Sequence, residues 1–139
     1  AEFYRNITGD SYIPILSNQT HALLKESKAA IVTSGTATLE AVILKVPQVV
    51  CYKTSTFSYF FGKLLVKVKF ISLVNLIANK EVVKELIQDD FNSDRLVKEL
   101  QFLLDKKNTS RIIGQYNKII DELGSEGASE RAAKAISLV

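Results

Sequence analysis

The chain has 139 residues, of which 47% are hydrophobic and 24% charged, so it can bury one globular core and is not disordered by default. A single cysteine excludes a disulfide framework and a cysteine-based zinc site, and a single histidine excludes most histidine metal sites. The net charge of +3 is too weak to imply a nucleic-acid partner, and we expect none.

Short apolar runs alternate with helical patterns through the first half of the chain. The predicted strands cover residues 12–16, 29–33, 48–52 and 70–73. The predicted helices cover residues 18–27, 36–45 and 56–66. Pro14 favours an edge position or a loop for the first of these strands. Strand–helix–strand order with continuously apolar strands predicts an α/β fold, with a partial Rossmann-like parallel sheet covered by helices on both faces.

The second half is predicted to be an all-helical C-terminal tail. Helical spacing of apolar residues predicts helices over residues 80–88, 93–105, 109–123 and 128–139. Ser93 can cap the second of these helices, and Gly124 and Gly127 separate the last two. We therefore divide the chain into an α/β part over residues 1–79 and a helical segment over residues 80–139, which packs on that part or on a partner chain.

The positive charge is concentrated in one stretch of the chain. No acidic residue occurs between Glu40 and Glu81, whereas that stretch holds six lysines and half of the aromatic residues. Such a stretch favours an anionic partner or a membrane surface. A buried helix with lysines on its rim is the alternative. No apolar run reaches 20 residues, so no segment is predicted to span a membrane.

The sequence Ser34-Gly35-Thr36 lies where a predicted buried strand ends and a helix begins, which is the edge where parallel sheets bind ligands. A helix N-terminus presents unpaired N–H groups and a positive dipole end, both of which favour phosphate. Glu40 lies one turn beyond Thr36, where its carboxylate can accept both hydroxyls of a ribose. These residues predict a nucleoside diphosphate site. The alternative is that the same pattern is an ordinary helix cap without a ligand.

Two further residues bear on this prediction. Asn75 is a polar residue inside an apolar run just after a predicted strand, so it either caps a turn of the chain or points at a ligand. His21 lies on a predicted helix without an acidic or nucleophilic pattern beside it, which favours a surface or core role. The sequence contains neither a P-loop nor a dinucleotide-binding glycine fingerprint.

The sequence from Ser34 to Glu40, with Pro47, the strand ending at Tyr52 and the sequence ISLVNLIA at residues 71–78, resembles the lipid-A-disaccharide synthases. The resemblance covers nearly the whole chain and places it in the C-terminal third of those enzymes. It implies the donor-side part of a two-domain, Rossmann-like glycosyltransferase of the GT-B type. Residues 1–79 would then be part of the nucleotide-sugar-binding domain.

The resemblance also implies an activity for the full-length protein. The family transfers 2,3-diacylglucosamine from UDP to 2,3-diacylglucosamine 1-phosphate, with inversion and without a metal or cofactor, and forms the β-1,6-linked disaccharide of lipid A. Its members work on the cytoplasmic face of the inner membrane of Gram-negative bacteria, where we expect this protein as a peripheral enzyme. We expect the chain to be a piece of a longer protein that lacks the catalytic aspartate, so it holds no catalytic residue, is inactive alone and self-associates through apolar helix faces.

The resemblance carries over to individual residues. It implies that Ser34, Gly35 and Thr36 hold the UDP diphosphate, that Glu40 holds the ribose, and that Asn75 and Gln88 lie near the donor. Val74 stands where the family has proline, which leaves the backbone before Asn75 less fixed. The residues expected to meet acyl chains or anionic headgroups are Phe57, Phe60, Phe61, Lys63 and Lys67. The alternatives are a non-catalytic module that binds a membrane or partner, and another UDP-sugar enzyme of the same fold, such as an epimerase.

Overall fold

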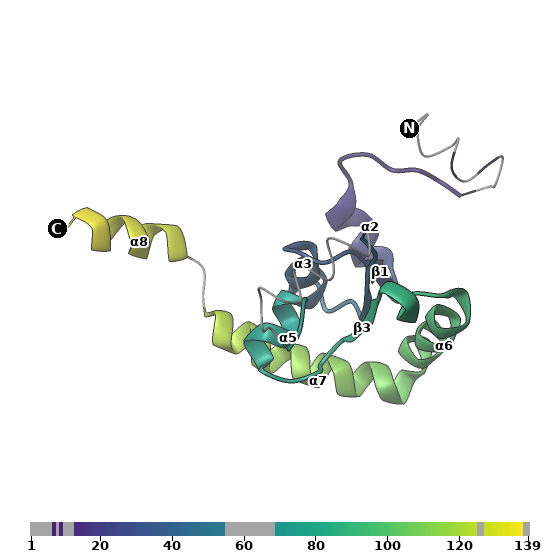
Figure 1. The fold of residues 1–139 in the computed structure, drawn as a ribbon. Helices are drawn as coiled ribbons and strands as arrows, with labels where there is room; N and C mark the ends of the chain where they lie inside the picture. Colours follow the sequence, from purple (N-terminus) through teal and green to yellow (C-terminus); the bar gives the residue numbers. More distant parts are fainter. Residues whose placement is uncertain (1–6, 8, 10–12, 55–68, 125–126, 138–139) are drawn as a thin grey trace.

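The computed structural model describes residues 7, 9, 13–54, 69–124 and 127–137. Within them lies a three-stranded parallel sheet with helices on both sides, followed by a helical C-terminal region (Figure 1). The strands, in spatial order, are β1 (Ala30–Val32), β2 (Gln48–Tyr52) and β3 (Lys84–Ile87). The partial Rossmann-like α/β class predicted from the sequence is confirmed.

The parallel pairing sets where a ligand can reach the sheet. Val50 of the central strand pairs with Val32 of β1 and with Glu85 of β3. The carboxyl ends of all three strands therefore share one edge, where the turn after β1 begins. Val49 and Val50 are fully buried, and their β-branched side chains suit a central strand that is covered on both faces.

The helices form two layers around the sheet. Helices α3 (Ala37–Ile43) and α5 (Leu73–Ala78) lie on one side of it, and α6 (Ser93–Leu104) lies on the other (Figure 1). The long α7 (Lys106–Leu123) runs from α6 toward α5 and contributes Tyr116 to the core. α2 (Thr20–Glu26) precedes β1, a 3-10 turn (Gln88–Asp90) follows β3, and α8 (Ala128–Ser137) ends the described chain.

Side-chain caps fix the starts of the later helices. Asn92 accepts a hydrogen bond from the N–H of Arg95 at 3.1 Å and so begins α6 one residue earlier than a Ser93 cap would. Asp105 accepts bonds from the N–H groups of Lys107 and Asn108 and begins α7 at Lys106, three residues before the predicted start. Polar caps of this kind satisfy backbone donors that the first helical turn leaves unpaired.

The structure corrects three of the predicted elements. Residues 13–16 form no strand, in keeping with the loop that Pro14 favours. The strand predicted at 70–73 is wrong, because Ser72 caps a helix that begins at Leu73. The helix predicted at 80–88 is also wrong, because Lys84–Ile87 forms β3. The sheet therefore extends past residue 79, and the domain division at that point remains a prediction. The helix predicted at 56–66 lies outside the described residues.

In the core, the polar side chains of Tyr116 in α7 and Gln48 in β2 are neighbours. Tyr116 is fully buried, and burial raises the pKa of its phenol to about 12, a rise that the neighbouring Gln48 only partly opposes. Within the described part of the chain, neither the Tyr116 hydroxyl nor Gln48 Oε1 has a hydrogen-bond partner in good geometry. The amide nitrogen of Gln48 donates to the carbonyl oxygen of Thr38 at 2.8 Å, which ties β2 to α3.

Candidate functional site

The turn between β1 and α3 is built around Gly35. Its φ of +118° lies in a region that residues with a Cβ rarely adopt, although a Cβ built there would meet no atom within 4 Å. Thr38 holds the turn from inside, because its hydroxyl donates to the Gly35 carbonyl oxygen at 2.7 Å. Among the described residues, none accepts a hydrogen bond from the N–H groups of Gly35, Thr36 or Ala37. The turn therefore presents backbone donors suited to an anion.

Thr36 and Ser34 differ in what their hydroxyls can offer. Thr36 is the residue before α3, is exposed, and makes no side-chain capping bond, so its hydroxyl can donate to a ligand. Ser34 is half-buried and donates its hydroxyl hydrogen to the carbonyl oxygen of Ile71 at 3.0 Å. A hydroxyl has one hydrogen to donate, so Ser34 in this arrangement offers a ligand only acceptor lone pairs.

Glu40 lies in α3 one turn beyond Thr36, as predicted, and its carboxylate is not free of partners. Glu40 Oε2 lies 3.1 Å from His21 Nε2 of α2. The pair is on the surface, with 71% of the His21 side chain and 37% of the Glu40 side chain exposed. Among the described residues, none bonds to the other carboxylate oxygen, which is open to a hydroxyl donor.

Asn75 is fully buried, and its side-chain amide is bonded within the protein. Its carbonyl oxygen accepts the N–H groups of Val82 at 2.7 Å and Val83 at 3.0 Å. Its amide nitrogen donates to the Val83 carbonyl and to Glu85 Oε1, each at 2.8 Å. Of the two roles that the sequence left open, these bonds match the cap: Asn75 fastens α5 to the chain that enters β3.

Glu85 is a site residue that sequence reasoning missed. Its carboxylate accepts the N–H groups of Ile71 at 2.9 Å and Ser72 at 3.0 Å, the Ser72 hydroxyl at 2.7 Å, and the Asn75 amide. In the sequence Glu85 lies within the helix predicted over residues 80–88, and nothing there marked it as a site residue. Only the pairing of β3 with β2 turns it toward the start of α5.

Gln88 lies at the carboxyl end of β3, on the same edge as the turn after β1. Its amide bonds to both backbone groups of Thr54, which follows β2. The structure thus places Ser34, Asn75 and Glu85 in one hydrogen-bonded group and Gln88 beside the next strand. The residues predicted to contact a membrane, Phe57, Phe60, Phe61, Lys63 and Lys67, lie outside the described residues.

Open space adjoins the turn on its other side. A cavity of about 410 Å³ lies between α2 and β1 and reaches Thr33 and Ala37. Its walls are mostly apolar and include Leu23, Leu24 and Val32. β1 is an edge strand of the described sheet, and residues 29–33, which include it, line this cavity.

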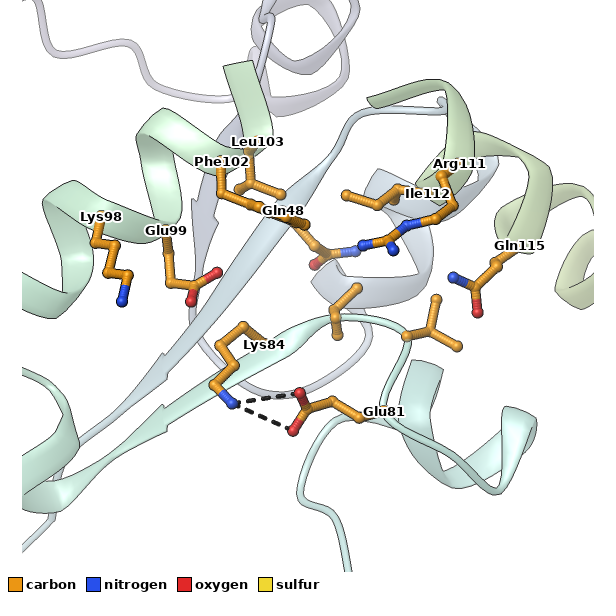
Figure 2. Close-up of a pocket in the computed structure, with 12 residues that line it drawn as sticks. Gln48, Glu81, Lys84, Lys98, Glu99, Phe102, Leu103, Arg111, Ile112 and Gln115 are labelled. Carbon is orange, nitrogen blue, oxygen red and sulfur yellow. Dashed lines mark hydrogen bonds and ion pairs between the residues drawn. The ribbon is translucent and has the colours of Figure 1, made fainter. Parts of the chain in front are cut away.

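A second cavity, of about 270 Å³, lies at the opposite edge of the sheet (Figure 2). Gln48 and Lys84, which begin β2 and β3, line it together with side chains from α6 and α7. Figure 2 shows Lys98 and Glu99 reaching in from α6 and Arg111 from α7. The turn follows the carboxyl end of β1, whereas this cavity lies at the starts of β2 and β3, so the two are distinct places.

The described residues contain neither a cluster of metal ligands nor a membrane-spanning helix. No group of three or more His, Cys, Asp or Glu side chains is placed to hold a metal ion among them. In the same residues, no helix is long and apolar enough to cross a membrane.

The chain matches a family described as lipid-A-disaccharide synthetase over residues 5–139. It is 41% identical over 128 residues to the lipid-A-disaccharide synthase of Sulfurihydrogenibium sp. (strain YO3AOP1), covering 91% of this chain and 33% of that protein. It is 46% identical over 103 residues to the synthase of Psychromonas ingrahamii, covering 74% of this chain and 27% of that protein. The chain thus spans about a third of the length of the curated relatives it matches.

Proposed function

The chain belongs to the lipid-A-disaccharide synthetase family, and on that premise we propose that it carries the donor-nucleotide side of a UDP-sugar-dependent glycosyltransferase. The observation that carries this proposal is the turn from Ser34 to Thr36 at the carboxyl edge of β1. Its unpaired N–H groups and the exposed Thr36 hydroxyl are the donors that a diphosphate needs. In this proposal, the free oxygen of Glu40 accepts a ribose hydroxyl.

The names of the relatives suggest the reaction. We propose that the full-length protein moves 2,3-diacylglucosamine from UDP to 2,3-diacylglucosamine 1-phosphate and forms the β-1,6 disaccharide with inversion. Of the two carboxylates described around the turn, Glu85 is occupied by four donors and Glu40 is assigned here to the ribose, so we propose neither as the general base. We propose that the base lies in a part of the full-length protein outside this chain, so that the chain alone catalyses no transfer.

The acylated substrates imply a membrane-bound setting. We propose that the protein works as a peripheral enzyme on the cytoplasmic face of the inner membrane, where Phe57, Phe60, Phe61, Lys63 and Lys67 meet lipid. We also propose self-association. Its support is apolar surface on the last two helices, where Leu123 is 41% and Ile136 76% exposed.

A chimaera tests the reaction directly. The chain replaces the aligned third of the Sulfurihydrogenibium relative, and the purified protein is given UDP-2,3-diacylglucosamine and the 1-phosphate acceptor. We expect the disaccharide and UDP, detected by mass spectrometry, and no transfer from UDP-N-acetylglucosamine. A folded chimaera that transfers only N-acetylglucosamine assigns the chain to another UDP-sugar enzyme. Binding of the isolated chain to anionic vesicles but not to UDP favours a non-catalytic module.

A further inference from the structure

A chain of hydrogen bonds connects the turn at Ser34 to Glu85 on β3 through Ile71. Ser34 donates its hydroxyl to the Ile71 carbonyl oxygen at 3.0 Å. On the other side of the same residue, the Ile71 N–H donates to Glu85 Oε2 at 2.9 Å. Ile71 lies outside any helix or strand, so these bonds are what fixes its orientation among the described residues.

The second oxygen of Glu85 anchors the start of α5. Glu85 Oε1 accepts the N–H of Ser72 at 3.0 Å, its hydroxyl at 2.7 Å, and the amide of Asn75 at 2.8 Å. A carboxylate suits this position because it is purely an acceptor and faces only donors. Among the described residues no Lys or Arg pairs with Glu85, so the carboxylate is held by these donors rather than by a cation.

We propose that Glu85 is a positioning residue for the donor-nucleotide site, acting through Ile71 on the Ser34 hydroxyl and so on the Ser34–Thr36 turn. It does not touch the nucleotide. By fixing Ile71 it keeps the Ser34 hydroxyl turned inward, which leaves the backbone N–H groups of Gly35 and Thr36 facing outward. The predicted effect on UDP affinity rests on the proposed function. The predicted effect on the conformation of the Ser34–Thr36 turn rests on the hydrogen bonds alone.

The test uses Glu85→Gln in this chain, followed by NMR of the backbone amides. The glutamine keeps the shape but replaces one oxygen with an NH₂ group, which then faces the Ile71 N–H, so two donors oppose each other. We expect the Gly35 and Thr36 resonances to move and the Kd for UDP to rise about threefold to tenfold. Glu81→Gln is the matched control, because Glu81 is exposed and, within the described part of the chain, pairs only with Lys84, at 3.3 Å.

Two further variants separate positioning from general destabilisation. Leu86→Ala removes a buried neighbour on the same strand, so it lowers stability but should leave the turn resonances and the Kd unchanged. In a Ser34→Ala background, Glu85→Gln should have no further effect on the turn, since the link is already cut. Ser34→Ala alone should in turn move the Ile71 and Ser72 resonances, a test that remains if Glu85→Gln does not fold.

The outcomes decide the proposal in either direction. Changes that stay within residues 71–86, with turn resonances and Kd as in the unmodified chain, overturn it. So does an equal effect of Glu85→Gln with and without the Ser34 hydroxyl. If the unmodified chain does not bind UDP, the proposed donor site fails instead, and the resonances of Gly35 and Thr36 still decide whether Glu85 positions the turn.

Discussion

The side-chain amide of Gln88 pairs with both backbone groups of Thr54, accepting its N–H at 2.8 Å and donating to its carbonyl oxygen at 3.0 Å. The last backbone pair of the two strands joins Tyr52 and Ile87, so the side chain adds one more step where the strands have ended. Gln88 itself has a φ of +53°, a conformation that turns its backbone away from the ladder.

This pairing predicts that Gln88 stabilises the carboxyl edge of the sheet. Gln88→Ala leaves two part-buried backbone groups of Thr54 without partners, and we expect it to lower the free energy of unfolding by about 1 to 2 kcal/mol. Urea unfolding followed by circular dichroism measures the change. The neighbouring Asp89 is exposed and serves as control, since Asp89→Ala should change stability by less than about 0.5 kcal/mol. Equal effects of the two variants would contradict a structural role for the pairing.

Gly35 and Gly114 should respond oppositely to alanine. Neither has an atom within 4 Å of a built Cβ, so backbone conformation alone separates them. At a φ of +118° Gly35→Ala is strained and should cost about 1 to 3 kcal/mol, whereas Gly114→Ala, inside α7, should stabilise by about 0.5 to 1 kcal/mol. Thermal unfolding of the two variants compares them. A neutral Gly35→Ala would show that the turn readily adopts another conformation.

Variants of Glu40 and His21 distinguish two roles of the Glu40 carboxylate: a contact with the ribose and a surface pair with His21. Glu40→Ala should weaken UDP binding about tenfold, because a hydrogen bond to a carboxylate is lost. His21→Ala should leave UDP binding as strong as before and stability within about 1 kcal/mol, since the pair is exposed. NMR titration of both variants gives the two Kd values. If His21→Ala weakens binding as much as Glu40→Ala, the pair as a whole rather than the free oxygen of Glu40 supports the site.

The phenol of Tyr116 predicts a loss of stability at high pH. Its pKa is about 12 in the folded chain against 10 for an ordinary tyrosine, so only the unfolded state ionises between these values. The contribution of the neutral phenol to the free energy of unfolding is therefore fully present below pH 10. It is lost as the pH rises toward 12, by at most about 2 to 3 kcal/mol. Tyr116→Phe should lack this component when urea unfolding is measured from pH 8 to 11. Parallel pH profiles for the two proteins would contradict the prediction.

Sequence reasoning located β1, β2 and the turn after β1 because their signals are local. An apolar run before Ser34-Gly35-Thr36 and a helical pattern after it are visible within fifteen residues. β3 was missed because Lys84 and Glu85 are good helix formers, and only pairing with β2 overrides their preference. Strand β3 in turn places Glu85 against Ile71 and Ser72, so the bonds of Glu85 depend on contacts between residues 10 to 14 apart. The bond from Ser34 to Ile71 joins residues 37 apart.

The prediction for Asn75 illustrates the same limit. Its position after an apolar run indicated either a cap or a ligand contact, and local sequence could not choose between them. The choice depends on whether Val82 and Val83 lie beside it, which follows from the turn after α5. Asn79 makes that turn with a φ of +48°, a conformation that asparagine adopts more easily than most residues. A polar residue in an apolar run was therefore a sound signal of a special role, without revealing its partner.

Titration of UDP into this chain, observed through its backbone amides by NMR, tests the central claim most directly. A donor site at the carboxyl edge predicts shifts concentrated at Gly35, Thr36 and Ala37 and continuing to Glu40, with little change at the buried Asn75. Shifts gathered instead around Lys98 and Arg111 would place the nucleotide in the cavity at the opposite edge. The absence of any shift at millimolar UDP, which corresponds to binding weaker than about −4 kcal/mol, would contradict a donor site in this chain.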